Sequence, residues 1–220
     1  MANKFKAHIV YKTSDGQRAP GASTITGVLN KGALIHWAWD LGIQGIDYKK
    51  YRDNLADIGT LAHYMILCLC KGETPDTSDY SNAQITAAEN CVKKFKSWLA
   101  ENSVEFLLVE HPLVSDKYRF GGMFDSLCKR KDNGKILLVD YKTSKAIYGE
   151  HFLQLAGYHH LVEENTEYKI DQNIILRIGR DDNEGFEVKV RDNLEKEWEL
   201  FKHCAEIYHL QKELKKAGRW

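Results

Sequence analysis

The sequence lacks the features that mark several large classes of protein. Of its 220 residues, only three are proline and five are cysteine, and 31 basic side chains balance 31 acidic ones. An odd number of scattered cysteines argues against a disulfide framework and for a reducing compartment. The chain has no apolar run of membrane-spanning length and no apolar N-terminal segment of signal length. We therefore expect a soluble, intracellular, cytoplasmic protein with no membrane partner.

Other absences limit its organisation and cofactors. No Gly-x4-Gly-Lys-Ser/Thr segment occurs, so ATP-driven unwinding would have to come from another protein. Neither a repeat nor a proline-rich or glycine-rich linker divides the chain, which predicts a single domain over residues 1–220. Within it, we expect a mainly helical part at 1–102, a core at 103–190 and a C-terminal helical part at 191–220.

Apolar periodicity predicts the elements of this domain. Helices are expected at residues 32–41, 49–70, 81–101, 150–164 and 194–215, with Gly42 and Gly72 as stop signals. Strands are expected at residues 5–11, 104–110, 119–129, 135–141, 172–178 and 185–190. Asn133-Gly134 between two strand-like runs is a hairpin signal. The expected fold class is α/β, an α/β/α sandwich around a small mixed sheet with a helical N-terminal region.

Charged residues end an apolar run at residues 136–139. Asp140 and Lys142 are two apart, so on a strand they project from the same face. A plain ion pair at a strand end is one interpretation of this pair. The other is catalytic, since Asp125 on the preceding strand would be brought beside Asp140 by the hairpin. Two neighbouring carboxylates supply the hard oxygen ligands that Mg²⁺ prefers.

Two helices carry further polar residues of interest. Gln154 and Tyr158 are four apart and share a helix face just after the Asp140 strand. His63 lies at the margin of the apolar stripe of an earlier helix. Taken alone, a histidine at such a position is more often a core residue with a satisfied hydrogen bond than a metal ligand.

Taken together, the segments Gly59-x3-His63, Asp125, Asp140-Tyr141-Lys142 and Gln154-x3-Tyr158 resemble the PD-(D/E)XK nuclease superfamily, specifically its RecB-like exonuclease branch. The segments at residues 22–26 and 33–38 are similar to the N-terminal Ser-x-Thr and Leu-x-x-Trp region of phage and bacterial members, a region also seen in a mitochondrial genome-maintenance exonuclease. The resemblance implies a restriction-endonuclease-like core.

The resemblance also implies roles for individual residues. Asp125, Asp140 and Lys142 would be catalytic, with Lys142 orienting or deprotonating the attacking water. The implied metal set, for Mg²⁺ or Mn²⁺, is His63, Asp125, Asp140 and Tyr141. Gln154, Tyr158, Thr143 and Lys145 would support the site or bind nucleic acid. Glu110 matches an acidic position on the first core strand, where it could touch the metal's water shell or be an ordinary strand-end carboxylate.

The cysteines argue against one cofactor of this branch. Some members hold an iron-sulfur cluster through one early cysteine and three grouped near the C-terminus. Here Cys204 alone lies beyond the nuclease motifs, so no such cluster is expected. Cys68 and Cys70, two apart on a helix, are expected to serve in packing rather than as a chelate.

Local charge is uneven although the total is zero. Basic residues gather around the acid-bearing hairpin, including residues 129–131, whereas acidic residues gather later. A local basic surface can bind phosphates, although residues 129–131 could also be a solvated hairpin tip.

Three functions fit these patterns. The first is a metal-dependent DNA exonuclease, phage-related or acting in replication, recombination or repair, with a recombination or replication protein or a second copy as possible partners; if phage-encoded, it would act in the host cytoplasm. The second is a non-catalytic nucleic-acid-binding or assembly subunit. The third is a restriction-type endonuclease, which shares Asp140-x-Lys142 but does not predict His63 together with Gln154 and Tyr158.

Overall fold

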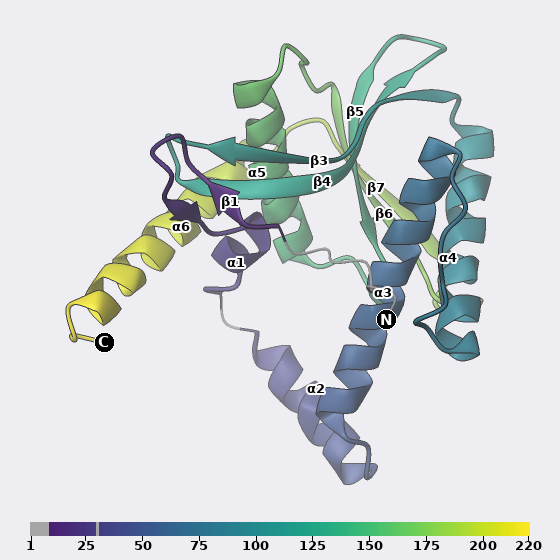
Figure 1. Ribbon diagram of the computed structural model, residues 1–220, viewed down its shortest axis with the longest axis horizontal. Coiled ribbons are helices and arrows are strands. Elements are labelled where there is room, and N and C mark those ends of the chain that lie inside the picture. The colour runs from purple at the N-terminus through teal and green to yellow at the C-terminus, as the bar shows by residue number, and fades with distance from the viewer. Residues whose placement is uncertain (1–8, 30) are drawn as a thin grey trace.

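A computed structural model describes residues 9–29 and 31–220. Its centre is a five-stranded sheet with spatial order β3-β4-β5-β6-β7, and helices cover both faces (Figure 1). The strands are β3 (Val104–Ser115), β4 (Phe120–Arg130), β5 (Ile136–Lys142), β6 (Gln172–Ile178) and β7 (Phe186–Arg191). The pair β5 and β6 is parallel and the other neighbours are antiparallel, so the sheet is mixed as predicted.

Two helical layers enclose the sheet. On one face lie α3 (Tyr48–Lys71) and α4 (Asn82–Glu101), and on the other lie α1 (Ala22–Thr26), α5 (Gly149–Asn165) and α6 (Glu195–Lys216). The strand alternation divides the core between the layers: Val139 and Tyr141 pack with α3 and α4, whereas Leu138 packs with α5. The predicted α/β/α sandwich is therefore confirmed.

Turn and cap chemistry fixes where several elements end. The Asn133-Gly134 hairpin joins β4 to β5, and Gly134 takes the positive φ of 75° that the turn needs. Gly72 ends α3 in the left-handed conformation, as predicted, and Ser81 begins α4 with a capping box. The prediction for Gly42 was wrong, because α2 (Gly32–Ile43) runs past it and Gly45 supplies the positive φ.

Other predicted bounds need correction at the sheet edge and the N-terminus. β3 continues five residues beyond the predicted end at Glu110, to Ser115, because it pairs along the whole of β4. Residues 5–8 of the strand predicted at 5–11 lie outside the described residues; β1 is Tyr11–Lys12, paired with β2 (Arg18–Ala19). The helix α1 was not predicted, since five residues carry too little periodicity.

Beyond the sandwich, α2 and the first half of α3 extend away from the sheet, and the C-terminal half of α6 projects from another side (Figure 1). Trp37 of α2 packs edge-on against Tyr48 of α3, with ring centroids 5.2 Å apart. Among the described residues, no helix is both long and apolar enough to cross a membrane.

Candidate active site

The polar residues singled out in the sequence converge where the end of β5 lies beside the middle of β4. Asp125 and Asp140 lie on these adjacent strands, both are almost fully buried, and β5 ends two residues after Asp140. Buried carboxylates are costly unless they are paired or bound to a cation. The partners of these two carboxylates therefore define what the site can do.

Asp125 joins the α3 helix to the sheet. Its Oδ1 lies 2.7 Å from His63 Nδ1, and its Oδ2 accepts a hydrogen bond of 2.6 Å from the backbone N–H of Tyr141. Burial opposes charge on Asp125, but His63 outweighs it and lowers the pKa of the carboxyl. Burial likewise opposes protonation of His63, and the Asp125 carboxylate overcomes it and raises the pKa of the imidazole. The pair is thus held in its charged form.

The approach of α3 to the end of β5 depends on Gly59, one turn before His63. A Cβ atom on Gly59 would lie 3.0 Å from the hydroxyl oxygen of Thr143. A side chain at this position would press on Thr143, so glycine eases the close passage of α3 by the end of β5.

Glu110 is the third member of a possible metal cluster. Ligand atoms of His63, Glu110 and Asp125 all lie within 4.8 Å of one another. Glu110 sits on β3 between residues that pair with the flanks of Asp125, and it has an unusual φ of 43° for a non-glycine residue. Burial, and next the charge of Asp125, raise the pKa of Glu110 to about 7. A divalent cation would relieve this repulsion.

Asp140 and Lys142 form a second polar unit, on the same face of β5 as predicted. Lys142 Nζ lies 2.6 Å from Asp140 Oδ2, yet this buried oxygen has no well-directed hydrogen bond among the described residues. Burial raises the pKa of Asp140 to about 6, and the Lys142 ammonium only partly opposes this effect. The negative charge of Asp140 is therefore only partly compensated by Lys142, and its Oδ2 atom could still accept a further positive partner.

The Lys142 ammonium continues this unit into α5. It donates a hydrogen bond of 3.0 Å to Gln154 Oε1, and Gln154 Nε2 donates one of 2.5 Å to Tyr158 Oη. The predicted common face of Gln154 and Tyr158 is confirmed. The chain Asp140, Lys142, Gln154, Tyr158 fixes the ammonium beside the carboxylates.

Two predicted residues have more limited roles in this geometry. The Tyr141 side chain points into the α3 and α4 layer, with its hydroxyl 2.7 Å from Ser126 Oγ and its ring 5.0 Å from Phe95. A metal contact by Tyr141 would have to come from its backbone carbonyl. Lys145 is exposed in the loop after β5. The metal set His63, Asp125, Asp140 and Tyr141 stays a prediction, and Glu110 lies closer to it than the sequence suggested.

Sequence reasoning missed the part played by the Gly121-Gly122 pair. A Cβ atom on Gly122 would lie 2.6 Å from the Tyr158 ring, and one on Gly121 would lie 2.2 Å from the Tyr11 ring. Both tyrosines thus pack closely against the bare backbone of β4, Tyr158 at three residues and Tyr11 at four residues before Asp125. Adjacent glycines inside a strand signal such a close approach.

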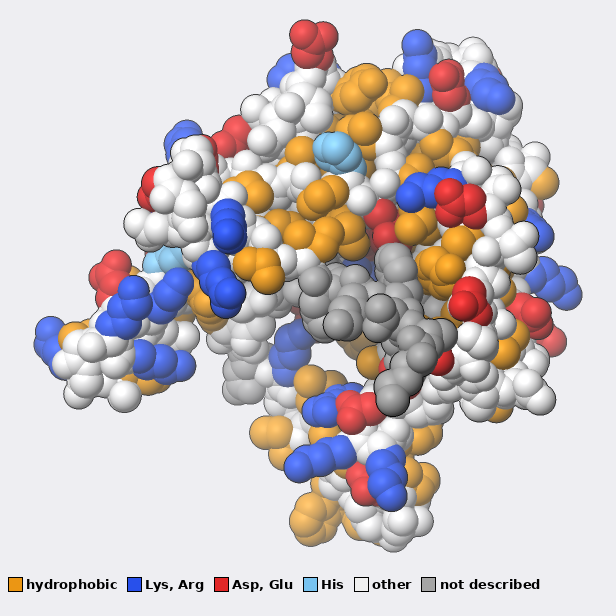
Figure 2. All heavy atoms as spheres, in the orientation of Figure 1, with side chains coloured by type: hydrophobic (Ala, Val, Ile, Leu, Met, Phe, Trp, Pro, Cys, Tyr) orange, Lys and Arg blue, Asp and Glu red, His pale blue; other side chains and the backbone are white. Residues whose placement is uncertain are grey.

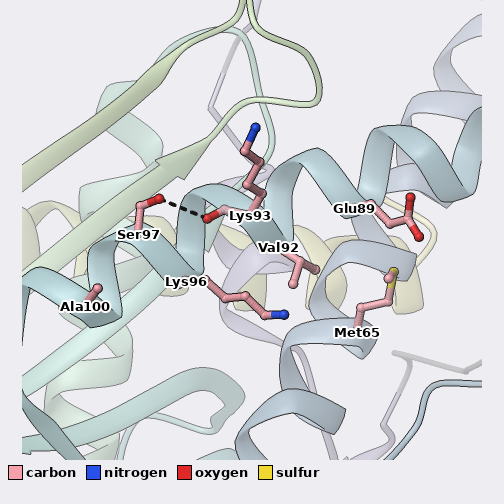
Figure 3. Close-up of a pocket in the computed structure, with 7 residues that line it drawn as sticks. All are labelled: Met65, Glu89, Val92, Lys93, Lys96, Ser97 and Ala100. Carbon is pink, nitrogen blue, oxygen red and sulfur yellow. Dashed lines mark hydrogen bonds between the residues drawn. The ribbon is translucent and has the colours of Figure 1, made fainter.

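A separate groove contains none of the candidate active-site residues. It measures about 570 Å³ and lies between α3 and α4, where Met65, Val92 and Lys96 reach into the space (Figure 3). None of the buried carboxylates lines it. Convergent ionisable groups with shifted pKa values are a better guide to an active site than volume.

The family model for the PD-(D/E)XK nuclease superfamily matches residues 29–217, which is most of the chain. This chain belongs to the PD-(D/E)XK nuclease superfamily. The superfamily expected from the sequence is thereby confirmed, and with it a nuclease fold whose members bind divalent metal ions. No curated protein is significantly similar to the chain in sequence.

Solved structures share the fold only loosely. A candidate exonuclease from Eubacterium rectale is 11% identical, with a TM-score of 0.48, and the match covers 74% of this chain and 69% of that one. An alkaline exonuclease from Laribacter hongkongensis is 12% identical, with a TM-score of 0.42, and the match covers 90% and 94%. The family assignment rests on the family model and not on these similarities.

Proposed function

We propose that this PD-(D/E)XK protein is a divalent-metal-dependent DNA exonuclease of the RecB-like branch. The observation that carries the proposal is that two units meet where the end of β5 lies beside the middle of β4. These units are the His63, Glu110 and Asp125 cluster and the chain from Asp140 to Tyr158. A decayed, purely binding site would not be expected to keep all of these groups. His63 and the Gln154–Tyr158 pair are what favour this branch over a restriction-type endonuclease.

The donor set fits a Mg²⁺ or Mn²⁺ ion. Carboxylate oxygens suit both ions, and an imidazole favours Mn²⁺. His63, Asp125 and Asp140, with Glu110 directly or through water, would hold it. When bound, such an ion lowers the pKa of water and offsets charge that builds on phosphorus.

Side chains of the protein position the attacking water and the DNA strand. Lys142, fixed between Asp140 and Gln154, is positioned to orient the attacking water and to hold or accept its proton. Tyr158 lies behind Gln154 and faces a pocket, where it can contact the DNA strand. We place the enzyme in DNA replication, recombination or repair inside the cell.

The decisive experiment is digestion of end-labelled linear DNA and of covalently closed circular DNA with Mg²⁺, Mn²⁺ or EDTA. We expect progressive loss of the linear substrate with either metal, survival of the circle and no cleavage in EDTA. Discrete fragments from an unnicked circle would move the assignment to a restriction-type endonuclease. Binding without cleavage in either metal would support the non-catalytic alternative.

A further inference from the structure

A second pocket leads away from the catalytic residues. It measures about 350 Å³, and its lining brings together Tyr158 from α5, Arg18 from β2, Ser23 and Thr24 from α1, and Tyr208 from α6. Tyr158 is also the last member of the chain that begins with the Asp140–Lys142 ion pair and continues by hydrogen bonds through Gln154. Tyr158 is therefore the residue that the pocket lining shares with the active-site residues.

Tyr208 connects this pocket to a hollow on the C-terminal helix. The same ring lines the hollow together with Gln211, Lys212, Lys215 and Lys216. At a rise of 1.5 Å per residue, Tyr208 and Lys216 lie about 12 Å apart along the axis of α6. The three lysines are exposed, and no ion pair among the described residues involves them.

The C-terminal end of α6 is basic, whereas its first turn is acidic. Residues 208–220 contain four basic side chains and one acidic one, although the chain as a whole has no net charge. Figure 2 shows several of these blue side chains on the projecting part of α6. The lysines, the exposed hydroxyls of Ser23 and Thr24 and the half-buried ring of Tyr208 suit a nucleic-acid strand. Positive charge attracts the phosphodiester backbone, and such contacts do not depend on base sequence.

We infer that the Arg18 and Tyr208 pocket and the end of α6 form a track for a nucleic-acid strand, along which the part of the substrate beyond the scissile bond lies. The inference rests on the proposed function, because the strand reaches the track from the site at Tyr158. On this assignment, the end of α6 contributes to affinity for long substrates and not to the chemical step.

The test is the pair Lys212→Gln/Lys215→Gln. Its matched control is Lys93→Gln/Lys96→Gln, which removes the same charge at the same spacing from exposed positions on α4. Binding of labelled single strands of about 5 and about 25 nucleotides is measured by fluorescence anisotropy in EDTA over a range of salt concentrations. Digestion of both lengths is then followed in Mg²⁺ and Mn²⁺.

We expect the α6 variant to bind the long strand several-fold more weakly and the short strand normally. The slope of log affinity against log salt should fall by about 1.4, as expected for two lost phosphate contacts on a single strand. KM for the long strand should rise, kcat should stay the same, and the control should behave like the wild type.

Three results would overturn the track: no change in the α6 variant, an equal loss in the α4 control, or an equal loss for short and long strands. If the wild type digested nothing in either metal but its long-strand binding still depended on the α6 lysines, the track would stand and the proposed exonuclease activity would fall.

Discussion

Asp140 and Lys142 are two residues apart and in contact, and we expect them to make opposite contributions to metal binding. The ammonium lies 2.6 Å from Asp140 Oδ2, so it would compete with a metal for the negative charge of this carboxylate. We expect Asp140→Asn to weaken Mn²⁺ binding and Lys142→Met to leave it unchanged or tighter. Both variants should lose more than about 100-fold in turnover. Calorimetric titration and single-turnover digestion measure the two effects, and near wild-type turnover in either variant would remove these residues from the site.

His63 offers a second test at single-residue resolution. If His63 ligates the metal, His63→Ala should weaken Mn²⁺ binding by at least about tenfold and slow cleavage with it. His203→Ala is the control, because His203 is exposed on α6 and pairs with Glu206 at 3.3 Å, away from the buried carboxylates. Unchanged Mn²⁺ affinity in His63→Ala would instead make this residue a structural partner of Asp125.

The packing of α5 on β4 can be tested through one glycine. Gly122→Ala places a methyl group 2.6 Å from the Tyr158 ring, so the ring or the strand must move. We expect a loss of about 1–3 kcal/mol in the free energy of unfolding and slower cleavage, because Tyr158 anchors Gln154. Denaturant unfolding and digestion rates measure both.

Gly149→Ala serves as the control for that substitution. Gly149 lies at the start of the same helix, and a Cβ atom there meets nothing within 4 Å. This change should leave the free energy of unfolding equal or slightly higher, since alanine favours helix over glycine. Equal destabilisation by both substitutions would contradict the steric account of Gly122.

The stability of the whole molecule should depend on pH in opposite ways with and without metal. Burial raises the pKa of Glu110 to about 7 and that of Asp140 to about 6, so the metal-free folded state binds more protons than the unfolded chain at mildly acidic pH. His63, whose pKa is raised by Asp125, acts in the same direction. Burial lowers the pKa values of His151 and His160 to about 4, and these two groups act in the opposite direction below about pH 6.5. The metal-free protein should therefore lose stability as the pH rises from about 6.5 to about 8.

Metal reverses this trend because its ligands must be deprotonated. The increase in Tm caused by Mn²⁺ should grow over the same pH range. Thermal unfolding in EDTA and in Mn²⁺ at several pH values tests the prediction. Glu110→Gln should flatten the pH dependence in EDTA, and an unchanged profile in that variant would mean that Glu110 does not titrate in this range.

Much of this protein could be predicted from local pattern alone. Apolar periodicity and turn residues located the three long helices before Val104 and the strands that carry Asp125 and Asp140, since these signals depend on neighbours in sequence. The Asn133-Gly134 hairpin made the two acidic strands adjacent, and the spacing of two put Asp140 and Lys142 on one face.

Other features depended on contacts between distant segments. The pairing of His63 with Asp125 and the closeness of Glu110 require α3 and β3 to meet at the middle of β4, which no local pattern encodes. The same is true of Tyr158 lying on Gly122. The sequence by itself determined the elements and the candidate chemistry. Only the tertiary structure decided the partners, because burial, repulsion and close approach arise when the layers pack together.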